Sequence, residues 1–197
     1  MENLTSQDMG NTLDNIRKEV PQEHDAFICC LLTHGKLGEL AGTDGEYLEV
    51  QKMLSLFTAE TCPNLSGKPK MFFIQACQGL ESHQKHPVNL QTDAPTPPSP
   101  GIATRLDLTI PNQADFLLGY ATVPGHVSYR NTVEGSWYIG VLTDKLARLH
   151  DKEDLLSILT AVNAKLSKES AEVGAGEYGQ IPAPITTLRK KVYFPLW

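Results

Sequence analysis

A cysteine and a histidine each follow a short apolar run in this sequence of 197 residues: Cys77 in "FFIQACQG" and His34 in "FICCLLTHG". Runs of this length are typical of strands in a parallel sheet, whose carboxyl ends meet at one edge and collect ligands. A thiolate is a strong nucleophile, and a neighbouring imidazole can form and hold it. We therefore expect Cys77 and His34 side by side in one cleft. Taken alone, Cys77 could equally pack as a small hydrophobe and His34 lie in a solvated loop.

Glycines accompany both residues. Gly35 follows His34, and Gly79 follows Cys77 and its neighbouring glutamine. A glycine beside the histidine leaves backbone N–H free to face a developing oxyanion, with the N–H of Cys77 as a second donor. Gly79 allows the chain to turn sharply past the cysteine. The alternative for either glycine is an ordinary turn.

The surrounding elements are expected to alternate between strands and helices. Helical spacing runs from Asn11 to Val20, and the apolar run over residues 26–32 predicts a strand buried on both faces. Residues 42–57 predict a turn and a helix with Leu48, Met53, Leu54 and Phe57 facing inward, before a second buried strand within residues 68–79. Two such strands joined by a helix form a parallel βαβ unit.

The alternation of strands and helices is then interrupted by a segment without periodicity and continues after it. Residues 84–108 are rich in proline and aperiodic, which favours an exposed, flexible linker. Another buried strand is expected within residues 114–123, helices over residues 135–149 and 154–166, and a final strand near the C-terminus. The sequence thus predicts a three-layer α/β sandwich with a mostly parallel central sheet. Its parts are residues 1–83, the linker 84–108, and residues 109–197.

The composition of the chain argues against several classes of function. The formal net charge is −6, and the one dense basic cluster is Leu188 to Lys191, which argues against nucleic-acid binding. The four cysteines lack the usual zinc spacings, so no metal or other cofactor is expected. No apolar run reaches the length of a membrane span, and free thiols suit the reducing cytoplasm.

Six blocks in order resemble the caspase family. "QACQG" matches its cysteine signature, and "HG" precedes it, while "ADFLLGYATV", "SYRN", "EGSWYI" and "TLRKKVYFP" follow. Within the family these blocks look most like the initiator caspases eight and ten. The resemblance implies a caspase-like sandwich and a cysteine endopeptidase that cleaves after aspartate in apoptotic signalling.

The resemblance also implies residue roles. Cys77 would be the nucleophile, His34 the general acid–base, and Gly35 an oxyanion donor. The substrate-binding set would be Gln75, Ser128, Tyr129, Arg130 and Trp137. Arg130 suits an aspartate side chain independently, because a guanidinium binds a carboxylate through two parallel hydrogen bonds.

Processing and assembly follow from the same resemblance. Relatives of this kind are zymogens cut after aspartate between a large and a small part. Asp93, in "NLQTD", is the first candidate, and Asp107 is the second. The segment from Thr186 to Phe194 is expected to form an edge strand that pairs two copies, or this chain with a related caspase.

Alternatives remain open because the match begins late in the family pattern. The positions that supply another pocket arginine and the first strand have no counterpart here, so one edge of the sheet should be uncovered. The chain could therefore be a catalytically weak or inactive truncated partner that dimerises with a full-length caspase and modulates it. A cysteine hydrolase that is not a protease, on a similar sheet, is a third reading.

Overall fold

The computed structural model describes residues 1–81, 83–84, 114–131, 135–169, 171–173 and 176–194. Its centre is a four-stranded sheet in the order β1-β5-β8-β14. Three parallel strands, β1 (Phe27–Leu32), β5 (Lys70–Gln75) and β8 (Phe116–Tyr120), lie side by side, and β14 (Ala183–Thr186) pairs antiparallel to β8. The expected mostly parallel sheet is confirmed.

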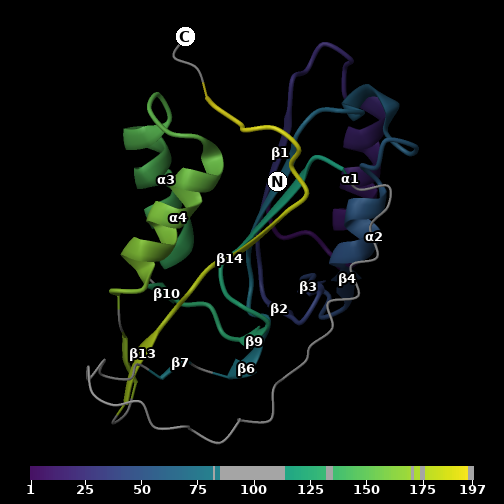
Figure 1. Ribbon diagram of the computed structural model, residues 1–197. Coiled ribbons are helices and arrows are strands. Elements are labelled where there is room, and N and C mark those ends of the chain that lie inside the picture. Colours follow the sequence, from purple (N-terminus) through teal and green to yellow (C-terminus); the bar gives the residue numbers. More distant parts are fainter. Residues whose placement is uncertain (82, 85–113, 132–134, 170, 174–175, 195–197) are drawn as a thin grey trace, which may run out of the picture.

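Helices cover both faces of this sheet (Figure 1). On one face lie α1 (Ser6–Glu19) and α2 (Val50–Ser55), and on the other lie α3 (Trp137–Leu149) and α4 (Leu155–Leu166). Successive side chains of a strand point to opposite faces. Accordingly, Phe72 and Ile74 pack in the cluster that holds α1 and α2, whereas Met71 and Phe73 pack in the one that holds α3 and α4. The three-layer sandwich predicted from the sequence is therefore confirmed.

The expectation that the first apolar strand is buried on both faces is wrong. All six residues of β5 are buried, but β1 alternates between half-buried and exposed positions. In the described part of the sheet β1 has β5 as its neighbour on one side and lies at the edge, not at the centre. Ile28 is 50% exposed and Leu32 is 59% exposed. The uncovered edge expected from the sequence is thus β1 itself.

Residues 42–57 also differ from the prediction. Tyr47–Glu49 forms β4, which pairs with β3 (Glu39–Ala41), and β3 pairs with β2 (Gly35–Lys36). The helix α2 therefore begins only at Val50, and Leu48 lies in a strand instead of on an inward helical face. Met53, Leu54 and Phe57 are buried as predicted.

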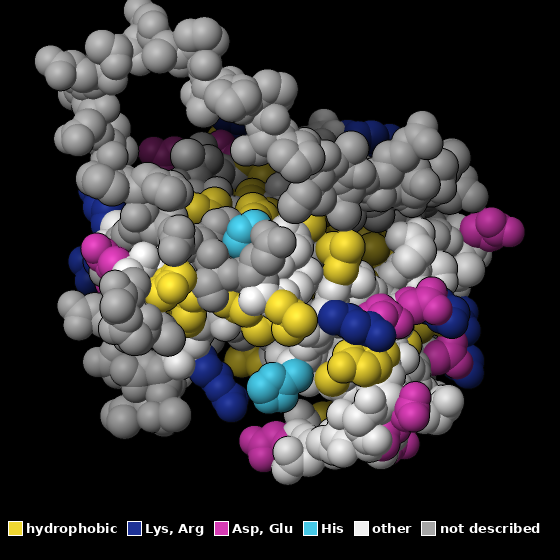
Figure 2. Space-filling model, turned by 90° about the horizontal axis from the view of Figure 1, so that it is seen from below, with side chains coloured by type: hydrophobic (Ala, Val, Ile, Leu, Met, Phe, Trp, Pro, Cys, Tyr) yellow, Lys and Arg dark blue, Asp and Glu magenta, His cyan; other side chains and the backbone are white. Residues whose placement is uncertain are grey.

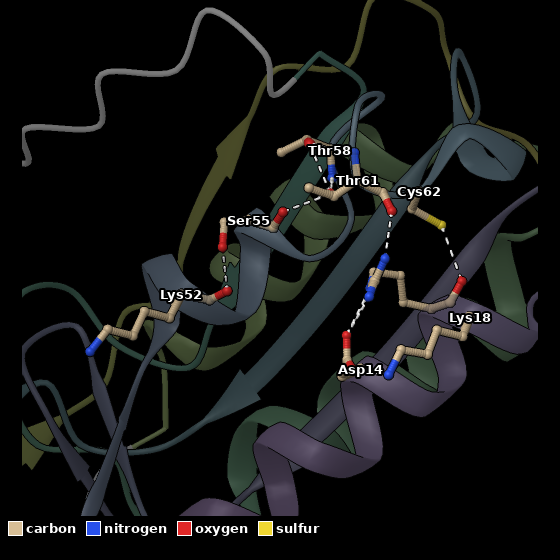
Figure 3. Close-up of polar contacts among 8 residues, drawn as sticks. Asp14, Lys18, Lys52, Ser55, Thr58, Thr61 and Cys62 are labelled. Atoms are coloured by element: carbon tan, nitrogen blue, oxygen red, sulfur yellow. Dashed lines mark hydrogen bonds and ion pairs between the residues drawn. The ribbon is translucent and has the colours of Figure 1, made fainter.

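Polar contacts tie α1 to the loop that follows α2 (Figure 3). Arg17 donates to the carbonyl oxygen of Thr61 at 2.8 Å, and the Cys62 thiol lies 3.7 Å from the Arg17 carbonyl oxygen. Asp14 bonds Lys18 and Arg17, and these hydrogen bonds hold the pKa of its carboxyl below the usual value. The loop leads through the 3₁₀ turn η1 (Pro63–Leu65) into β5, so these contacts anchor the strand that precedes Cys77.

The C-terminal strand ends earlier than predicted. Thr187 still exchanges backbone hydrogen bonds with Asp115 and Phe116, but residues 188–194 leave the sheet. Leu188, Val192 and Phe194 pack against the cluster that holds α3 and α4, and the N–H of Leu155 donates to the Val192 carbonyl oxygen at 2.8 Å. Burial of these side chains was expected, but they achieve it against the helical layer.

The remaining strands are short and gather near one end of the molecule (Figure 1). They are β6 (Gly79–Glu81) with β9 (Gly125–His126), β10 (Arg130–Asn131) with β11 (Gly135–Ser136), and β13 (Gly176–Gly179) between β12 (Ala171–Val173) and β7 (His83–Gln84). Seen from that end, hydrophobic, basic, acidic and histidine side chains intermingle on the surface (Figure 2). Across the described residues, every helix is too short or too polar to cross a membrane.

Candidate active site

A cleft of about 500 Å³ opens where β1 and β5 end. It collects side chains from both halves of the sequence: Leu32, Thr33, His34, Gln75, Cys77, Ser128, Arg130, Gly135 and Ser136. Five residues singled out from the sequence, namely His34, Gln75, Cys77, Ser128 and Arg130, therefore share one cavity. Their meeting point is the carboxyl edge of the parallel strands, as expected for ligand sites in such sheets.

The parallel register of β1 and β5 brings His34 to Cys77. Leu32 is the partner of Gln75, and the N–H of Thr33 donates to the Gln75 carbonyl oxygen at 3.1 Å. Gly35 tightens the approach, because a Cβ at this position would lie 3.2 Å from the Cys77 carbonyl oxygen. The two chain segments are thus in backbone contact beside the thiol. The separation of the His34 ring from the sulfur, expected to be about 4–7 Å, stays a prediction.

The sulfur of Cys77 lies against Ser128. The N–H of Ser128 donates to Sγ at 3.5 Å, Ser128 Oγ lies 3.8 Å from it, and the Ser128 carbonyl oxygen lies 3.9 Å away. All three groups belong to Ser128, so the sulfur has polar neighbours on the side of that loop. The role of Cys77 as a nucleophile stays a prediction.

Close backbone contact holds the Ser128 loop in place. The N–H of Gln78 donates to the His126 carbonyl oxygen at 2.9 Å, and the N–H of Gly125 donates to the Gln78 carbonyl oxygen at 2.8 Å. A Cβ on Gly79 would lie 2.1 Å from the Gly125 carbonyl oxygen. Only glycine admits this approach, so the role of Gly79 is close packing of β6 against β9.

The Gln75 amide joins two serines. Its Nε2 donates to Ser128 Oγ at 2.9 Å, and its Oε1 accepts from Ser136 Oγ at 2.6 Å. The residue is only 8% exposed, so a bond at each end of the amide meets the requirement that buried polar groups be paired. Gln75 therefore reaches the cleft with a hydrogen bond at each end of its amide.

The other two predicted pocket residues lie beside the cleft. The rings of Tyr129 and Trp137 are 5.4 Å apart, and Trp137 lines a neighbouring hollow of about 240 Å³ with Gly140 and Glu169. Arg130 is exposed and lines the cleft itself. The structure thus brings Arg130 to the Cys77 cleft and places the two aromatic residues in its surroundings.

Sequence reasoning missed Ser136 and Gln180. Gln180 is 1% exposed, accepts from the Tyr129 N–H at 2.7 Å, and donates to the Ala121 carbonyl oxygen at 2.7 Å, which ties the pocket segment to the end of β8. Ser136 had one visible signal, because a serine immediately before an apolar helix is a typical N-cap. Nothing in the sequence linked either residue to the cleft. The predicted processing sites Asp93 and Asp107 lie outside the described residues.

Comparison with known proteins shows which family and which relatives the chain is similar to. The caspase domain model matches residues 1–193. The chain is 45% identical over 181 residues to caspase-8 of Rattus norvegicus, which covers 87% of this chain and 36% of that protein. It is 40% identical over 195 residues to caspase-8 of Mus musculus, covering 98% of this chain and 40% of that protein. It is 36% identical over 195 residues to caspase-3 of Mus musculus, covering 97% and 67%.

Proposed function

This chain belongs to the caspase family, and we propose from that membership and from its cleft that it is a cysteine endopeptidase that cleaves proteins after aspartate. The observation that carries the proposal is the convergence of Cys77, His34, Gln75 and Arg130 on one cavity. A nucleophile with an acid–base partner supplies the chemistry, and a guanidinium with an amide supplies the recognition of a carboxylate.

The proposed reaction begins with attack of Cys77 Sγ on the backbone carbonyl carbon of the substrate aspartate. His34 takes the thiol proton and gives it to the departing amine, which leaves a thioester on Cys77. The backbone N–H groups of Gly35 and Cys77 stabilise the negative oxygen that develops on the carbonyl. Water activated by His34 then hydrolyses the thioester, releases the new carboxyl terminus and restores the thiol.

Recognition of the aspartate side chain is assigned to Arg130 and Gln75, with Ser128 between Gln75 and the sulfur. The guanidinium provides charge and two parallel donors, and the amide provides a further N–H. The aromatic pair Tyr129 and Trp137 borders the hollow next to the cleft and is assigned to substrate residues that precede the aspartate.

Maturation by cleavage is part of the same proposal. The chain would act as a zymogen divided into residues 1–83, a linker 84–108 and residues 109–197, with Asp93 as the main cleavage site and Asp107 as the second. Support comes from the cleft itself, because its lining residues come from both flanking parts. Two fragments that share an active site and a central sheet would stay associated after the cut.

The proposal also covers the assembly of the chain, its pathway and its location in the cell. An initiator role in apoptotic signalling follows from the resemblance to caspase-8, and the four free thiols suit the cytoplasm. A homodimer, or a heterodimer with a related caspase, would form through the segment from Thr186 to Phe194, which follows β14 at the edge of the described sheet, since an edge strand can pair with a second copy.

A second candidate is a modulating partner with little activity of its own. The chain spans 36% to 40% of the two caspase-8 relatives. Exposed Ile28 and Leu32 on β1 favour this candidate, because an apolar, unpaired edge can take up a strand from another chain.

Labelling with a peptidyl aspartyl fluoromethylketone tests the first candidate. We expect one adduct on Cys77 by peptide mass spectrometry, and hydrolysis of a matching aspartyl peptide but not of its asparaginyl analogue. Asp93→Ala should block the cut after residue 93 in the active protein. A chain that takes no label, yet changes the rate of a full-length caspase when mixed with it, would replace the first candidate with the second.

A further inference from the structure

Ser136 occupies two positions at once, as the N-cap of α3 and as a lining residue of the Cys77 cleft. Its Oγ accepts from the Ile139 N–H at 3.1 Å, which satisfies one of the free donors at the start of the helix. The single hydroxyl hydrogen of Ser136 therefore remains for another acceptor. The acceptor within reach is Gln75 Oε1, at 2.6 Å.

That hydroxyl decides which way the Gln75 amide points. A primary amide can turn over and exchange its oxygen and nitrogen, since both ends can form hydrogen bonds. Here the Ser136 hydroxyl donates to the near end, which is the amide oxygen, so Nε2 lies at the far end and donates to Ser128 Oγ at 2.9 Å. Nε2 carries two hydrogens, and the second is available to an acceptor in the cleft that Gln75 lines.

The backbone before Ser136 and the β10–β11 ladder also hold this serine in place. Gly135 has φ +85°, a left-handed conformation that side-chain-bearing residues rarely adopt, and it leads directly into Ser136. In the β10–β11 ladder, Arg130 is the cross-strand partner of Ser136. The two groups assigned to the carboxylate are therefore both set by this short ladder, Arg130 directly and Gln75 through the serine hydroxyl.

We propose that Ser136 is a positioning residue that fixes the Gln75 amide with its nitrogen toward the cleft, and so sets the preference of the cleft for a carboxylate over an amide side chain. This inference rests on the proposed function, in which Gln75 contacts the substrate aspartate. With the amide reversed, Oε1 would face the carboxylate and repel it. With the amide held as it is, an N–H meets the charge.

The chain offers a matched pair of variants for the test. Threonine and glycine are comparable N-cap residues, but only threonine carries a hydroxyl. Ser136→Thr therefore keeps both the cap and the donor, whereas Ser136→Gly keeps most of the cap and loses the donor. Thermal unfolding of the two variants shows whether α3 is equally stable in both.

The first measurement is kcat and KM on two peptides that differ only in aspartate or asparagine before the cut. Ser136→Thr should keep the wild-type ratio of kcat/KM between the two peptides. Ser136→Gly should lower it about fivefold to tenfold, because the aspartyl peptide loses a hydrogen bond to a charge and the asparaginyl peptide loses a weaker, neutral one. The loss should appear as a higher KM for the aspartyl peptide with kcat nearly unchanged. Equal ratios in the two variants would overturn the inference.

The second measurement needs no turnover. In chains carrying Cys77→Ala, nuclear Overhauser contacts between the Gln75 side-chain N–H₂ and the Ser128 β protons report the amide orientation. These contacts should be present with Ser136→Thr and weak or absent with Ser136→Gly, and their persistence with Ser136→Gly would contradict the proposed positioning. If the contacts follow the hydroxyl but the wild-type chain cleaves no aspartyl peptide, positioning by Ser136 stands and the proposed function fails.

Discussion

Neighbouring strands β1 and β5 have similar apolar sequences but different surroundings. They pair in parallel over six residues, from Phe27 with Lys70 to Leu32 with Gln75. All of β5 is buried, because strands flank it on both sides and helices cover both faces. β1 alternates between half-buried and exposed residues, because it lies at the edge of the described sheet and Ile28 and Leu32 are largely uncovered.

The cysteines in β1 and the cysteine that follows β5 also differ in their surroundings. In β1, Cys29 is half-buried and Cys30 is exposed beside apolar neighbours, and partial desolvation raises the pKa of both thiols, that of Cys29 to about 11. Cys77 lies just beyond the end of β5, in a cleft lined by polar side chains. Similar apolar runs thus lead to thiols of raised pKa in one strand and to a candidate nucleophile after the other. The distinction depends on the end of the strand and not on its composition.

The largest expected effect separates the two kinds of thiol. Cys77→Ala should reduce kcat/KM on an aspartyl peptide by about 10⁴-fold or more, because the nucleophile is lost. Cys30→Ala is the matched control and should retain activity, since that thiol lies in an apolar hollow with Ile28 and Phe73. Circular dichroism should show both variants folded. Equal turnover in the two variants would remove Cys77 as the nucleophile.

Burial predicts a second contrast, this time in stability. Ile74 on β5 is 0% exposed, so Ile74→Ala should lower the free energy of unfolding by about 2–5 kcal/mol. Ile28 on β1 is half exposed, and Ile28→Ala should lower it by less than about 1 kcal/mol. Urea unfolding followed by tryptophan fluorescence measures both. A large effect at Ile28 would mean that something covers the β1 edge in solution.

On the other side of the sheet, an ion pair lies between the residue before β8 and the segment after β14. Asp115, which has φ +68°, bonds Arg189 through both carboxylate oxygens, at 3.0 and 2.5 Å. These bonds hold its pKa below the usual value. Asp115→Asn keeps the shape and tolerates the left-handed backbone. It should lower the free energy of unfolding at pH 7 by about 1–3 kcal/mol.

The pH dependence of this effect has a definite sign. Because the folded pKa of Asp115 is depressed, its contribution is full above the unfolded pKa of about 4 and disappears as the pH falls below it. The difference between Asp115→Asn and wild type should therefore shrink towards pH 3 in urea titrations. Lys191→Gln is the control, because its ion pair with Asp154 is 3.4 Å long and the lysine is 70% exposed, so little change is expected.

The smallest effect concerns the reactivity of the β1 thiols. A raised pKa keeps Cys29 and Cys30 protonated at neutral pH, and the thiolate is the form that reacts. Alkylation of both by iodoacetamide in the native chain should be slow at pH 7 and still rising at pH 9.5. Peptide mass spectrometry resolves the two sites, and a rate for Cys30 that levels off below pH 8 would contradict the burial effect.

Much of the architecture could be read from local pattern. The strands at Phe27–Leu32 and Phe116–Tyr120, and the helices α3 and α4, match the predicted segments closely. The reason is that apolar periodicity reports which side of an element must leave water. Gly35 next to His34, and Gln75 two residues before Cys77, were also informative, because signature residues lie close to each other in the chain.

Local pattern could not decide which strand lies at the edge, because an apolar run looks the same whether or not a neighbour covers it. It also misjudged residues 188–194, where Arg189 meets Asp115 and the chain turns onto the helical layer. The β4 strand before α2 was missed because its partner β3 supplies the hydrogen bonds.

The sequence by itself determined the α/β class, the candidate nucleophile Cys77 and its partner His34, since strand ends and residue types carry that information. Only the tertiary structure decided how the pocket is held. Gln75 lies 53 residues before Ser128 and 61 before Ser136, and the three form one hydrogen-bonded series because β5 and the β10–β11 ladder meet in space. A hydrogen bond requires two groups within about 3 Å, and that distance is set by packing of elements and not by order along the chain.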